Sequence, residues 1–348
     1  MDDLDRRLLN RIQSDFPLVA RPFAELGQPL GLSEDETIAR MQALKDGRIV
    51  RQISAIFDTK SLGYKSSLVA MRVDPARITE AARIINEHPG VTHNYERNHE
   101  YNLWFTIAVP PTSDLESVVQ RIHELVNADV TRVMYTLRLF KIGVNLDMTG
   151  KRAPDAISAP EYREQDRARA QDFTVTDEDK AVIRELQEDL PIEARPFRAL
   201  AERIGLDEDG LFAVMRSLVE RGFMRRMAAI LYHRRAGFKA NGMGVWAVPE
   251  ERVIELGEQM ASFANVSHCY RRPTYPDWPY NVFTMVHGQS NEQCEEILAA
   301  ISRATGVTEY ISLYSTREYK KTRTKFYTPA YEEWEAKYMP QPETVPAT

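Results

Sequence analysis

The sequence has few cysteines, no long apolar run and no excess of basic residues, and each absence excludes a class of protein. Only two cysteines, Cys269 and Cys294, occur in 348 residues, which excludes a disulfide framework and a cysteine metal cluster. No apolar stretch approaches the ~20 residues that a membrane-spanning helix needs. The acidic start lacks the basic and apolar parts of a secretory signal. We therefore expect a cytoplasmic protein that does not associate with a membrane.

The charge balance argues against a nucleic-acid binder. The net charge is -6, whereas DNA- and RNA-binding domains usually carry a basic stripe. A local basic patch can be hidden in an acidic total, so charge alone leaves the question open. The chain also lacks a Gly-rich phosphate loop, an HExxH zinc motif and a Ser-centred catalytic motif.

The chain contains two copies of one sequence. Residues 4–26 align with 178–200 at a shift of 174, and both copies carry the motif Ala-Arg-Pro-Phe. Further on, VTHNYER at 91–97 aligns with VSHCYRR at 266–272. A charged segment rich in proline and alanine separates the copies, so we expect a linker at 148–174.

Each copy divides into a helical part and a mixed part. Apolar residues at helical spacing predict a winged helix-turn-helix at 1–60 and again at 175–235. The strand and helix patterns that follow have the order βαββαβ, the ferredoxin-like plan, at 61–147 and 236–325, with a tail at 326–348. The expected fold class is α+β, a tandem duplication of these two domains.

The third helix of each helical part begins with acidic residues. Ser33 and Glu36 form a capping-box pattern in the first copy, where Gly47 ends the helix, and Asp207 is the expected N-cap in the second. In a DNA-binding protein these positions would meet bases and phosphates, which repel acidic groups. The acids instead suit the helix dipole. We therefore interpret these domains as structural packing units or oligomer arms.

One strand in each copy carries a histidine, a tyrosine and an arginine at alternate positions. They are His93, Tyr95 and Arg97, and His268, Tyr270 and Arg272. Alternate side chains share one face of a strand, and an arginine beside an aromatic ring and an imidazole suits a flat, anionic ligand. The alternative is an edge strand of half-exposed polar residues whose histidine bonds to backbone.

The first strand of the second βαββαβ domain differs from its counterpart. Met243 and Val245 are expected to face the helices. Gly242, Gly244 and Trp246 would then lie on the other face, where two glycines leave room for a flat ligand beside a tryptophan. A bulge or tight backbone packing is the alternative. We expect the main pocket in the second copy, with residues of the first copy reaching it across the pairing interface.

Basic and aromatic residues gather near the same strand. The loop Pro273–Pro279 is rich in proline and aromatic residues, and we interpret it as a lid or wall over the ligand. A rigid hairpin packed on a neighbouring subunit is the alternative. Two other histidines, His88 and His123, lie in helices and are expected at the surface. The further binding candidates are Arg225, Arg226, Lys239, Tyr275, Trp278, Tyr280 and Arg317.

A winged helix-turn-helix followed by a βαββαβ domain resembles the Lrp/AsnC family of regulators. Within that group, a tandem copy with HNYER and HCYRRPTYPDWPYN resembles the siroheme decarboxylases, which occur as two paired subunits. The run REYKK at 317–321 resembles the second subunit type. The resemblance implies a fusion of both subunits. Its activity would remove two acetate carboxylates from siroheme to give didecarboxysiroheme in haem or dioxo-haem synthesis.

The resemblance also implies roles for the shared residues. His268, with His93 second, would supply the proton that replaces the departing carboxylate, or lie near the siroheme iron. Arginines would hold the carboxylates that stay on the macrocycle. No cofactor beyond the substrate's iron is expected, because the macrocycle itself accepts electron density. The halves would form a pseudo-dimer, and a further homo-oligomer stays open.

Three other functions fit the same residues. An Lrp/AsnC-type regulator would bind duplex DNA in a salt-dependent way. A tetrapyrrole sensor would bind the ligand without turnover, and a structural partner in a haem-synthesis complex would not bind it tightly. The sequence leaves open the order of the two decarboxylations, the number of active halves, any residual DNA binding and the oligomeric state.

Overall fold

The computed structural model describes residues 1–14, 16–142, 153–157, 173–232 and 240–340. Most of the expected linker therefore lies outside the described residues. No helix within these ranges combines the length and the apolar character needed to cross a bilayer.

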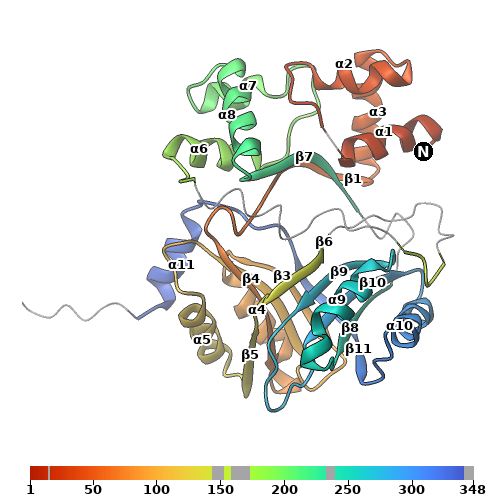
Figure 1. Cartoon of the computed structure of the whole chain (residues 1–348). Coiled ribbons are helices and arrows are strands. Elements are labelled where there is room, and N and C mark those ends of the chain that lie inside the picture. Colours follow the sequence, from red (N-terminus) through yellow and green to blue (C-terminus); the bar gives the residue numbers. More distant parts are fainter. Residues whose placement is uncertain (15, 143–152, 158–172, 233–239, 341–348) are drawn as a thin grey trace, which may run out of the picture. The chain divides into compact units, whose positions relative to one another are not determined.

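The chain forms two compact units, and each unit combines matching parts of both copies (Figure 1). The helical unit comprises residues 1–62 and 165–237, and the sheet unit comprises residues 63–164 and 238–348. The α+β class and the duplication expected from the sequence are confirmed.

Each copy contributes three helices and one strand to the helical unit. The first copy forms α1 (Asp3–Ser14), α2 (Pro22–Gly27), a 3-10 turn (Gln28–Leu30), α3 (Glu34–Asp46) and β1 (Val50–Phe57). The second copy forms α6 (Asp177–Leu186), α7 (Arg198–Arg203), α8 (Glu208–Glu220) and β7 (Met224–Leu231).

The expected wing is shared between the two copies. Strands β1 and β7 pair with each other in an antiparallel two-stranded sheet. The N–H of Phe16 donates to the carbonyl of Met227 (3.0 Å), and the N–H of Leu190 donates to the carbonyl of Ile53 (2.8 Å). Because both donors and both acceptors are equivalent at the shift of 174, the two copies are related by an approximate twofold axis.

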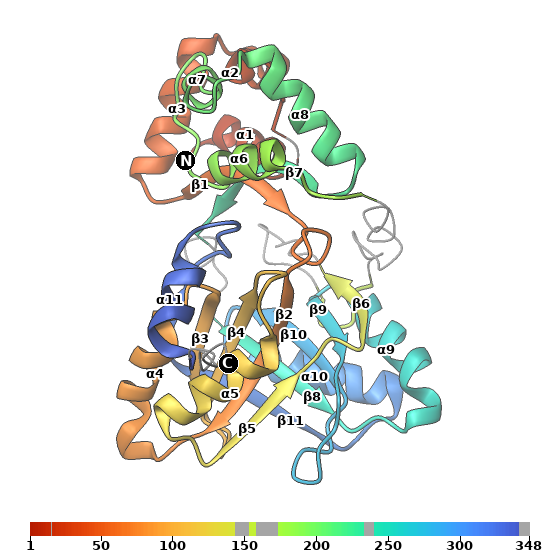
Figure 2. The same ribbon diagram turned by 90° about the vertical axis from the view of Figure 1, so that its left-hand side faces the viewer.

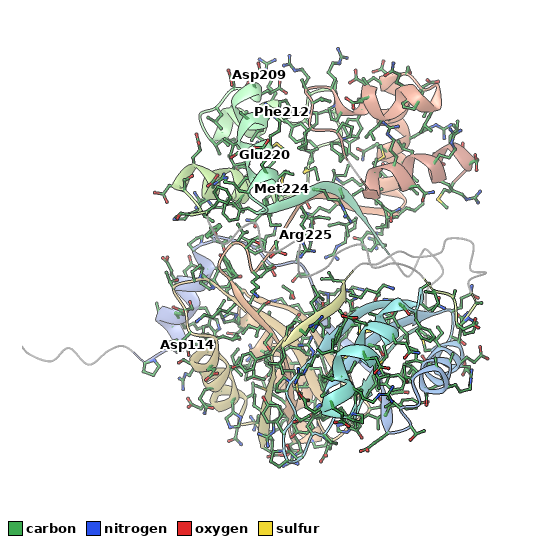
Figure 3. All side chains as sticks on the ribbon, in the orientation of Figure 1. Asp114, Asp209, Phe212, Glu220, Met224 and Arg225 are labelled. Atoms are coloured by element: carbon green, nitrogen blue, oxygen red, sulfur yellow. The ribbon has the colours of Figure 1, made fainter. Side chains whose placement is uncertain are left out.

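The arginine of the Ala-Arg-Pro-Phe motif anchors the third helix of each copy. Arg21 is ion-paired with Glu34, and Arg195 is ion-paired with Glu208. The expected capping box of α3 is also present. Of the acidic residues in the first turn of α8, Asp209 is exposed (Figure 3). The first acid of each third helix thus bonds within its own copy.

The sheet unit contains two βαββαβ domains. The first copy forms β2 (Lys65–Arg72), α4 (Ile78–Glu87), β3 (Val91–Arg97), β4 (Leu103–Val109), α5 (Leu115–Val126), β5 (Val130–Met134) and β6 (Arg138–Ile142). The second copy forms β8 (Ala240–Trp246), α9 (Val253–Ser262), β9 (Val266–Arg271), β10 (Val282–Gly288), α10 (Asn291–Thr305) and β11 (Tyr310–Lys321). A 3-10 turn precedes α4 at Pro75–Arg77 and α9 at Glu250–Arg252.

The last strand of each copy is divided between the two copies. The strands hydrogen-bond in the order β5-β2-β4-β3-β11-β8-β10-β9-β6. The first part of β11, Tyr310–Tyr314, pairs with β8 of its own copy, and the part from Ser315 to Lys321 pairs with β3 of the other copy. In the first copy the corresponding segment forms two strands. β5 pairs with β2 of its own copy, and β6 pairs with β9 of the second copy. Each copy therefore completes the sheet of the other.

Helices cover one face of this sheet, and a shared core fills the other. α4 and α5 lie against the strands of the first copy, and α9 and α10 lie against those of the second (Figures 1 and 2). On the opposite face, Ala70 and Trp104 of the first copy join Val245 and Phe283 of the second in one hydrophobic core. We call this opposite side the inner face.

Strand β8 faces the opposite way from our expectation. Met243 and Val245 lie in the core of the inner face. Added Cβ atoms on Gly242 and Gly244 would meet side chains of α10, and Trp246 is fully buried in the helix-side core. The prediction that Trp246 lines the ligand site was therefore wrong.

The error came from one additional residue in the second copy. The copies align at a shift of 174 as far as Arg225, but His93 aligns with His268 at a shift of 175. If β8 is aligned at the shift of 174, each of its residues is matched to a residue of the first copy whose side chain lies on the opposite face. This happens because side chains alternate along a strand. At a shift of 175, Ala70 corresponds to Val245, and both lie on the inner face.

The glycines of β8 make room for α10 and not for a ligand. A Cβ on Gly244 would lie 2.5 Å from Leu298 Cδ2 and 2.9 Å from Thr284 Oγ1. A Cβ on Gly242 would meet its nearest neighbours at 3.3 Å. Tight packing between strand and helix, the alternative interpretation, is the correct one.

The segment expected to be a tail includes α11 (Ala330–Tyr338), which packs on the first copy of the sheet unit. The ring centroids of His88 and Trp334 are 4.5 Å apart. Nδ1 of His88 accepts a hydrogen bond from the N–H of Gly90 (3.0 Å), and burial lowers the pKa of His88 to about 3. The prediction that His88 lies at the surface was wrong, because α11 covers it.

We predict that Gly244→Ala destabilises the protein by about 1–3 kcal/mol, the range for overpacking a filled core. The new methyl group would overlap the buried side chain of Leu298. Gly242→Ala, a matched control on the same face, should cost less. In the double variant with Leu298→Ala, part of the added volume is accommodated, so the two losses should not add. Urea unfolding curves measure this, and additive losses would contradict the proposed contact.

Candidate functional site

Two matching sets of polar side chains lie on the inner face of the sheet unit. The first set is His93, Tyr95 and Arg97 on β3, and the second is His268 and Tyr270 on β9 with Arg272 directly after it. The residues between them point to the helices: Asn94 donates to Asn86 on α4 (3.0 Å), and Cys269 belongs to the helix-side core. This packing agrees with the shared face expected from the alternation.

Each arginine of the two sets reaches the last strand of the opposite copy. Nη1 of Arg97 donates to the carbonyl of Leu313 on β11 (3.0 Å), and Nη1 of Arg272 donates to the carbonyl of Met134 on β5. The guanidinium carbon of Arg97 also lies 5.8 Å from the centre of the tyrosine ring in its own set. In the second set this distance is 4.8 Å. Contact between the two copies therefore holds both arginines in place.

Neither guanidinium has a carboxylate partner among the described residues. Arg97 is 7% exposed and Arg272 is 8% exposed, and the Nε atom of each has no hydrogen-bond partner there. Burial lowers the pKa of both arginines to about 10, which leaves them charged at neutral pH. A buried charge without a counter-ion is costly. An anionic ligand would offset that cost.

The histidines lie beside the tyrosines and are close enough to influence each other. Ring centroids are 6.1 Å apart both in the pair His93 and Tyr95 and in the pair His268 and Tyr270. Desolvation by the surrounding protein, and next the charges of His93, Arg272 and a buried lysine, together lower the pKa of His268 to about 4. Without a ligand, His268 is therefore neutral at pH 7. Carboxylates placed beside it would raise its pKa.

A β-bulge precedes each of these histidines. The pairing register shifts at Thr92 in β3 and at Ser267 in β9. The Thr92 hydroxyl lies 3.1 Å from Nδ1 of His93, and the Ser267 hydroxyl lies 2.8 Å from Nδ1 of His268. Bulges redirect side chains and occur often beside active sites. Our sequence reasoning missed these hydroxyls, although both copies carry one directly before the histidine.

A buried lysine near His268 was also missed. Lys141 on β6 is 5% exposed, and its Nζ donates to the carbonyl of Phe263 (2.8 Å). It comes from the exchanged strand of the first copy, so no local pattern in the sequence places it beside β9. It pairs with Cys269 and so lies on the helix side of the sheet, from where its charge still lowers the pKa of His268.

The loop Pro273–Pro279 packs on the first copy. The hydroxyl of Tyr275 donates to a backbone carbonyl of β5 (2.7 Å). Asp277 accepts hydrogen bonds from Arg132 (2.9 Å) and from the hydroxyl of Tyr101 (2.6 Å). These contacts agree with the alternative interpretation of a rigid packed hairpin, although its neighbour is the other half of the same chain and not another subunit. A role of the loop as a lid or wall over a ligand stays a prediction.

Two aromatic candidates near this loop belong to the hydrophobic core of the inner face. Trp278 is 1% exposed, and the rings of Trp278 and Tyr280 make an edge contact at 5.2 Å. Trp278 thus fills space between the copies, and Tyr280 packs at the edge of that core.

Arg317 faces α4 and not the inner face. Its Nη1 lies 3.5 Å from Thr79 Oγ1 on α4, and its guanidinium packs on Tyr319, which contacts the helix-side core. Two register shifts in β11 break the simple alternation of its side chains. The prediction that Arg317 joins the site was therefore wrong.

Three basic candidates are not part of the described inner face. Arg225 and Arg226 belong to β7 of the helical unit, where Arg225 is ion-paired with the buried Asp58 at 2.5 Å (Figure 3). Lys239 lies outside the described residues. Any contribution of these three residues to ligand binding stays a prediction.

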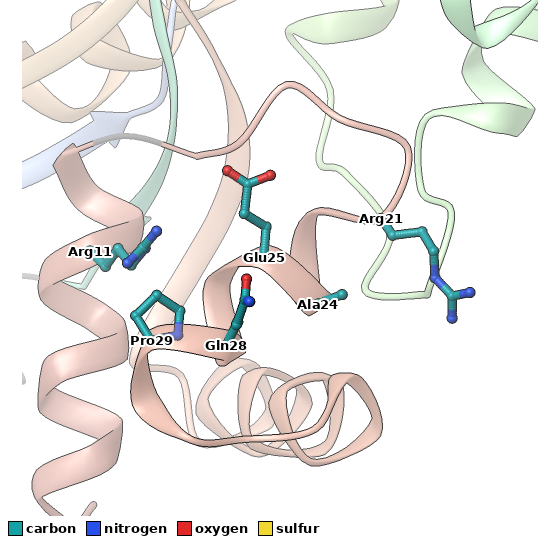
Figure 4. A pocket seen from close by; sticks show the side chains of 6 residues that line it. All are labelled: Arg11, Arg21, Ala24, Glu25, Gln28 and Pro29. Carbon is teal, nitrogen blue, oxygen red and sulfur yellow. The ribbon is translucent and has the colours of Figure 1, made fainter.

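A separate pocket lies in the helical unit. Arg21, which lines it, is ion-paired with Glu34, so one of its two arginines already has a counter-ion. Within the described ranges, no three His, Cys, Asp or Glu side chains come together as a metal site. The residues that line the pocket are Arg11, Arg21, Ala24, Glu25, Gln28 and Pro29 (Figure 4).

Comparison with known proteins identifies the family of both copies. A family model described as "AsnC-like ligand binding domain" matches residues 61–141 and 235–320. Another, described as "Siroheme decarboxylase NirDL-like HTH domain", matches residues 5–51 and 179–225. The "Siroheme decarboxylase" of Hydrogenobacter thermophilus is 41% identical over 94% of this chain and 96% of its own. This chain belongs to the siroheme decarboxylase family.

Members of the siroheme decarboxylase family include separate subunits. The "Siroheme decarboxylase beta subunit" of Methanosarcina barkeri is 44% identical over 41% of this chain and 95% of its own length. A crystal structure of the siroheme decarboxylase NirDL in complex with an iron-uroporphyrin III analogue is also similar. Its TM-score is 0.76 at 35% identity, over 97% of this chain and 98% of that chain. The family and the pairing of two halves expected from the sequence are confirmed.

We predict that the ring of His268 titrates near pH 4 in the ligand-free protein, as NMR of labelled histidine would measure. Arg272→Met removes a positive charge, so the pKa of His268 should rise, yet stay below its ordinary value because desolvation of the ring, the larger cause of the lowered pKa, remains. His93→Gln should act in the same direction. His123→Gln on α5 is the control and should leave the titration unchanged. An ordinary pKa for His268 in the unmodified protein would contradict the described burial.

Proposed function

We propose that this protein is a siroheme decarboxylase, which removes two acetate carboxylates from siroheme as CO2 and leaves methyl groups. The observation that carries the proposal is the pair of buried arginines, Arg97 and Arg272, without carboxylate partners among the described residues. Siroheme is a flat macrocycle with eight carboxylates around an iron. Its shape and charge complement a face that presents two cations, two tyrosine rings and two histidines. Membership of the siroheme decarboxylase family supports the same substrate.

Binding rests on electrostatics inside a weakly solvated site. A carboxylate about 4 Å from a guanidinium gains about 4 kcal/mol at an effective dielectric constant of about 20. Two such contacts would offset much of the cost of burying Arg97 and Arg272. The planar guanidinium can also bind a carboxylate through two parallel hydrogen bonds, which fixes its orientation. We assign both arginines to carboxylates that stay on the macrocycle.

Each decarboxylation needs one proton and a group that accepts the two electrons of the broken C–C bond. When the carboxylate leaves as CO2, the electrons of the broken C–C bond stay on the methylene carbon, and one proton converts that carbon into a methyl group. The conjugated macrocycle of the substrate accepts the electron density, so the proposal includes no cofactor beyond the iron of siroheme. The protein holds the substrate, excludes water and delivers the proton.

We assign the delivery of the proton to His268, with His93 as the second candidate. In the ligand-free protein the lowered pKa keeps His268 neutral. Substrate carboxylates beside the ring would stabilise its charged form and raise its pKa towards neutrality. The ring would then become an effective acid only when the substrate is bound. Tyr95 and Tyr270 are assigned to the faces of the macrocycle, because their rings lie next to these histidines.

We predict that anaerobic incubation with siroheme yields a tetrapyrrole that has lost two molecules of CO2, as mass spectrometry would detect. His268→Ala should bind siroheme with near-normal affinity and decarboxylate it about 10²–10⁴-fold more slowly, the usual range for losing a general acid. Siroheme that binds tightly but stays unchanged would favour a sensor. Wild-type turnover by His268→Ala would remove this residue from the mechanism.

We predict that Arg97→Met and Arg272→Met each weaken siroheme binding about ten- to hundredfold, because a hydrogen bond to a charged group contributes about 1.5–3 kcal/mol. Their ligand-free melting temperatures should not fall, since replacing an unpaired buried charge by an apolar side chain is often neutral or stabilising. Arg317→Met is the control, because Arg317 faces α4. Absorbance titration measures binding. Unchanged affinity with a large loss of stability would make the arginines purely structural.

A further inference from the structure

A series of hydrogen-bonding contacts connects His268 with Asn241, an exposed residue near the start of β8. Nδ1 of His268 lies 2.8 Å from the hydroxyl oxygen of Ser267, and this oxygen lies 2.6 Å from Nε2 of His287 on β10. Nδ1 of His287 is 2.7 Å from Oδ1 of Asn241 on β8, which is exposed. Each contact in this series joins groups that can accept or pass on a proton, apart from the terminal amide.

The β-bulge of β9 makes this series possible. Ser267 occupies the position where the ladder between β9 and β10 shifts register, so it has no direct partner on β10. Its hydroxyl is thereby placed between two imidazole rings that lie on neighbouring strands. In a regular ladder the side chain of Ser267 would point away from that of His268.

The first copy lacks the outer histidine of this series. Thr106 on β4 lies opposite the site histidine of the first copy, as Met285 on β10 lies opposite that of the second. Two residues further along these equivalent strands, His287 corresponds to Ala108. The alanine is buried and cannot carry a proton.

The hydroxyls of the first copy bond to each other instead. Thr92 Oγ1 lies 2.7 Å from Thr106 Oγ1, and both lie within 3.4 Å of Nδ1 of His93. Among the hydrogen bonds described for the first copy, neither hydroxyl contacts a second imidazole ring, in contrast to Ser267. Both copies therefore have a histidine on the inner face. In the second copy a further histidine, His287, contacts the hydroxyl beside it.

We propose that Ser267 and His287 resupply the proton that His268 gives to the substrate, and that this makes the second copy the protonating half. The inference rests on the proposed decarboxylation. The Ser267 hydroxyl gives its proton to Nδ1 of neutral His268 while protonated His287 gives its Nε2 proton to the Ser267 oxygen, which leaves His268 charged. Charged His268 then gives its Nε2 proton to the methylene carbon and stays neutral with its proton on Nδ1. His287 regains one proton from solvent, so one proton enters for the one that the carbon receives.

The route matters because the substrate itself would cover the inner face. Decarboxylation consumes a proton while the macrocycle occupies the site. A half-buried ring covered by a bound macrocycle has little direct access to water. The serine and the outer histidine reach the same ring from its other nitrogen. His287 thus acts on the reaction through His268 and is a positioning residue.

Steady-state kinetics of the full chain with siroheme under anaerobic conditions test the proposal. We expect His287→Gln and Ser267→Ala to lower kcat at least about tenfold with KM unchanged, since proton delivery and not binding is impaired. Imidazole in the buffer should restore part of the activity of His287→Ala. His123→Gln is the matched control, because His123 also bonds to a threonine hydroxyl (2.9 Å) but lies on α5. Its kcat should stay unchanged.

The asymmetry of the two copies gives a second comparison. Thr92→Ala removes the hydroxyl equivalent to that of Ser267, and we expect it to lower kcat less than Ser267→Ala does. Equal effects in both copies, or full activity of His287→Gln, would overturn the proposal while the decarboxylase function stands. A lack of turnover in the unmodified protein would instead remove the proposed function.

NMR of labelled histidine tests the hydrogen-bonded series without turnover. In the ligand-free protein, His287→Gln should change the nitrogen resonances of the His268 ring, because it removes the acceptor or donor on the far side of Ser267. His123→Gln should leave those resonances unchanged. If the His268 signals are the same in His287→Gln and in the unmodified protein, the two rings are not coupled and the proposal fails.

Discussion

The last strand of each copy ends in the sheet of the other copy, and the inner face depends on this exchange. β11 continues from β8 to β3, and β6 pairs with β9. The carbonyls that bind the two buried guanidinium groups belong to Leu313 on β11 and Met134 on β5, and each lies in the copy opposite to its arginine. An isolated copy would lack these partners. In a fused chain both copies are present in equal number, so the exchange is always possible within one molecule.

Charge is concentrated on this inner face although the whole chain is acidic. Arg97 and Arg272 are buried there, and desolvation together with the charges of His93, Arg272 and Lys141 holds the neighbouring His268 in its neutral form. Such an arrangement is unfavourable without a ligand and favourable with an anionic one. The same electrostatics that would attract a carboxylated macrocycle would thus also turn His268 into an acid on binding. Affinity and protonation are coupled through one set of charges.

The two copies have kept some features and lost others since the duplication. The His-Tyr-Arg alternation, the bulge before the histidine and the bond from arginine to the opposite copy are present twice. Beyond these, β8 carries Gly244 where the first copy has Val69, and β10 carries His287 where the first copy has Ala108. The first difference lets α10 approach its strand closely. The second gives only one copy a paired imidazole behind its site histidine.

Local pattern in the sequence was sufficient for the repeat, the helix caps, the βαββαβ order and the shared face of His268, Tyr270 and Arg272. These features depend on spacing between near neighbours, which the chain shows directly. The tertiary structure alone decided which way β8 and Arg317 face, where the loop after Arg272 packs, and that Ser267 links two rings. One inserted residue or one bulge reverses the alternation of a strand, and strand partners distant in sequence determine what a side chain meets.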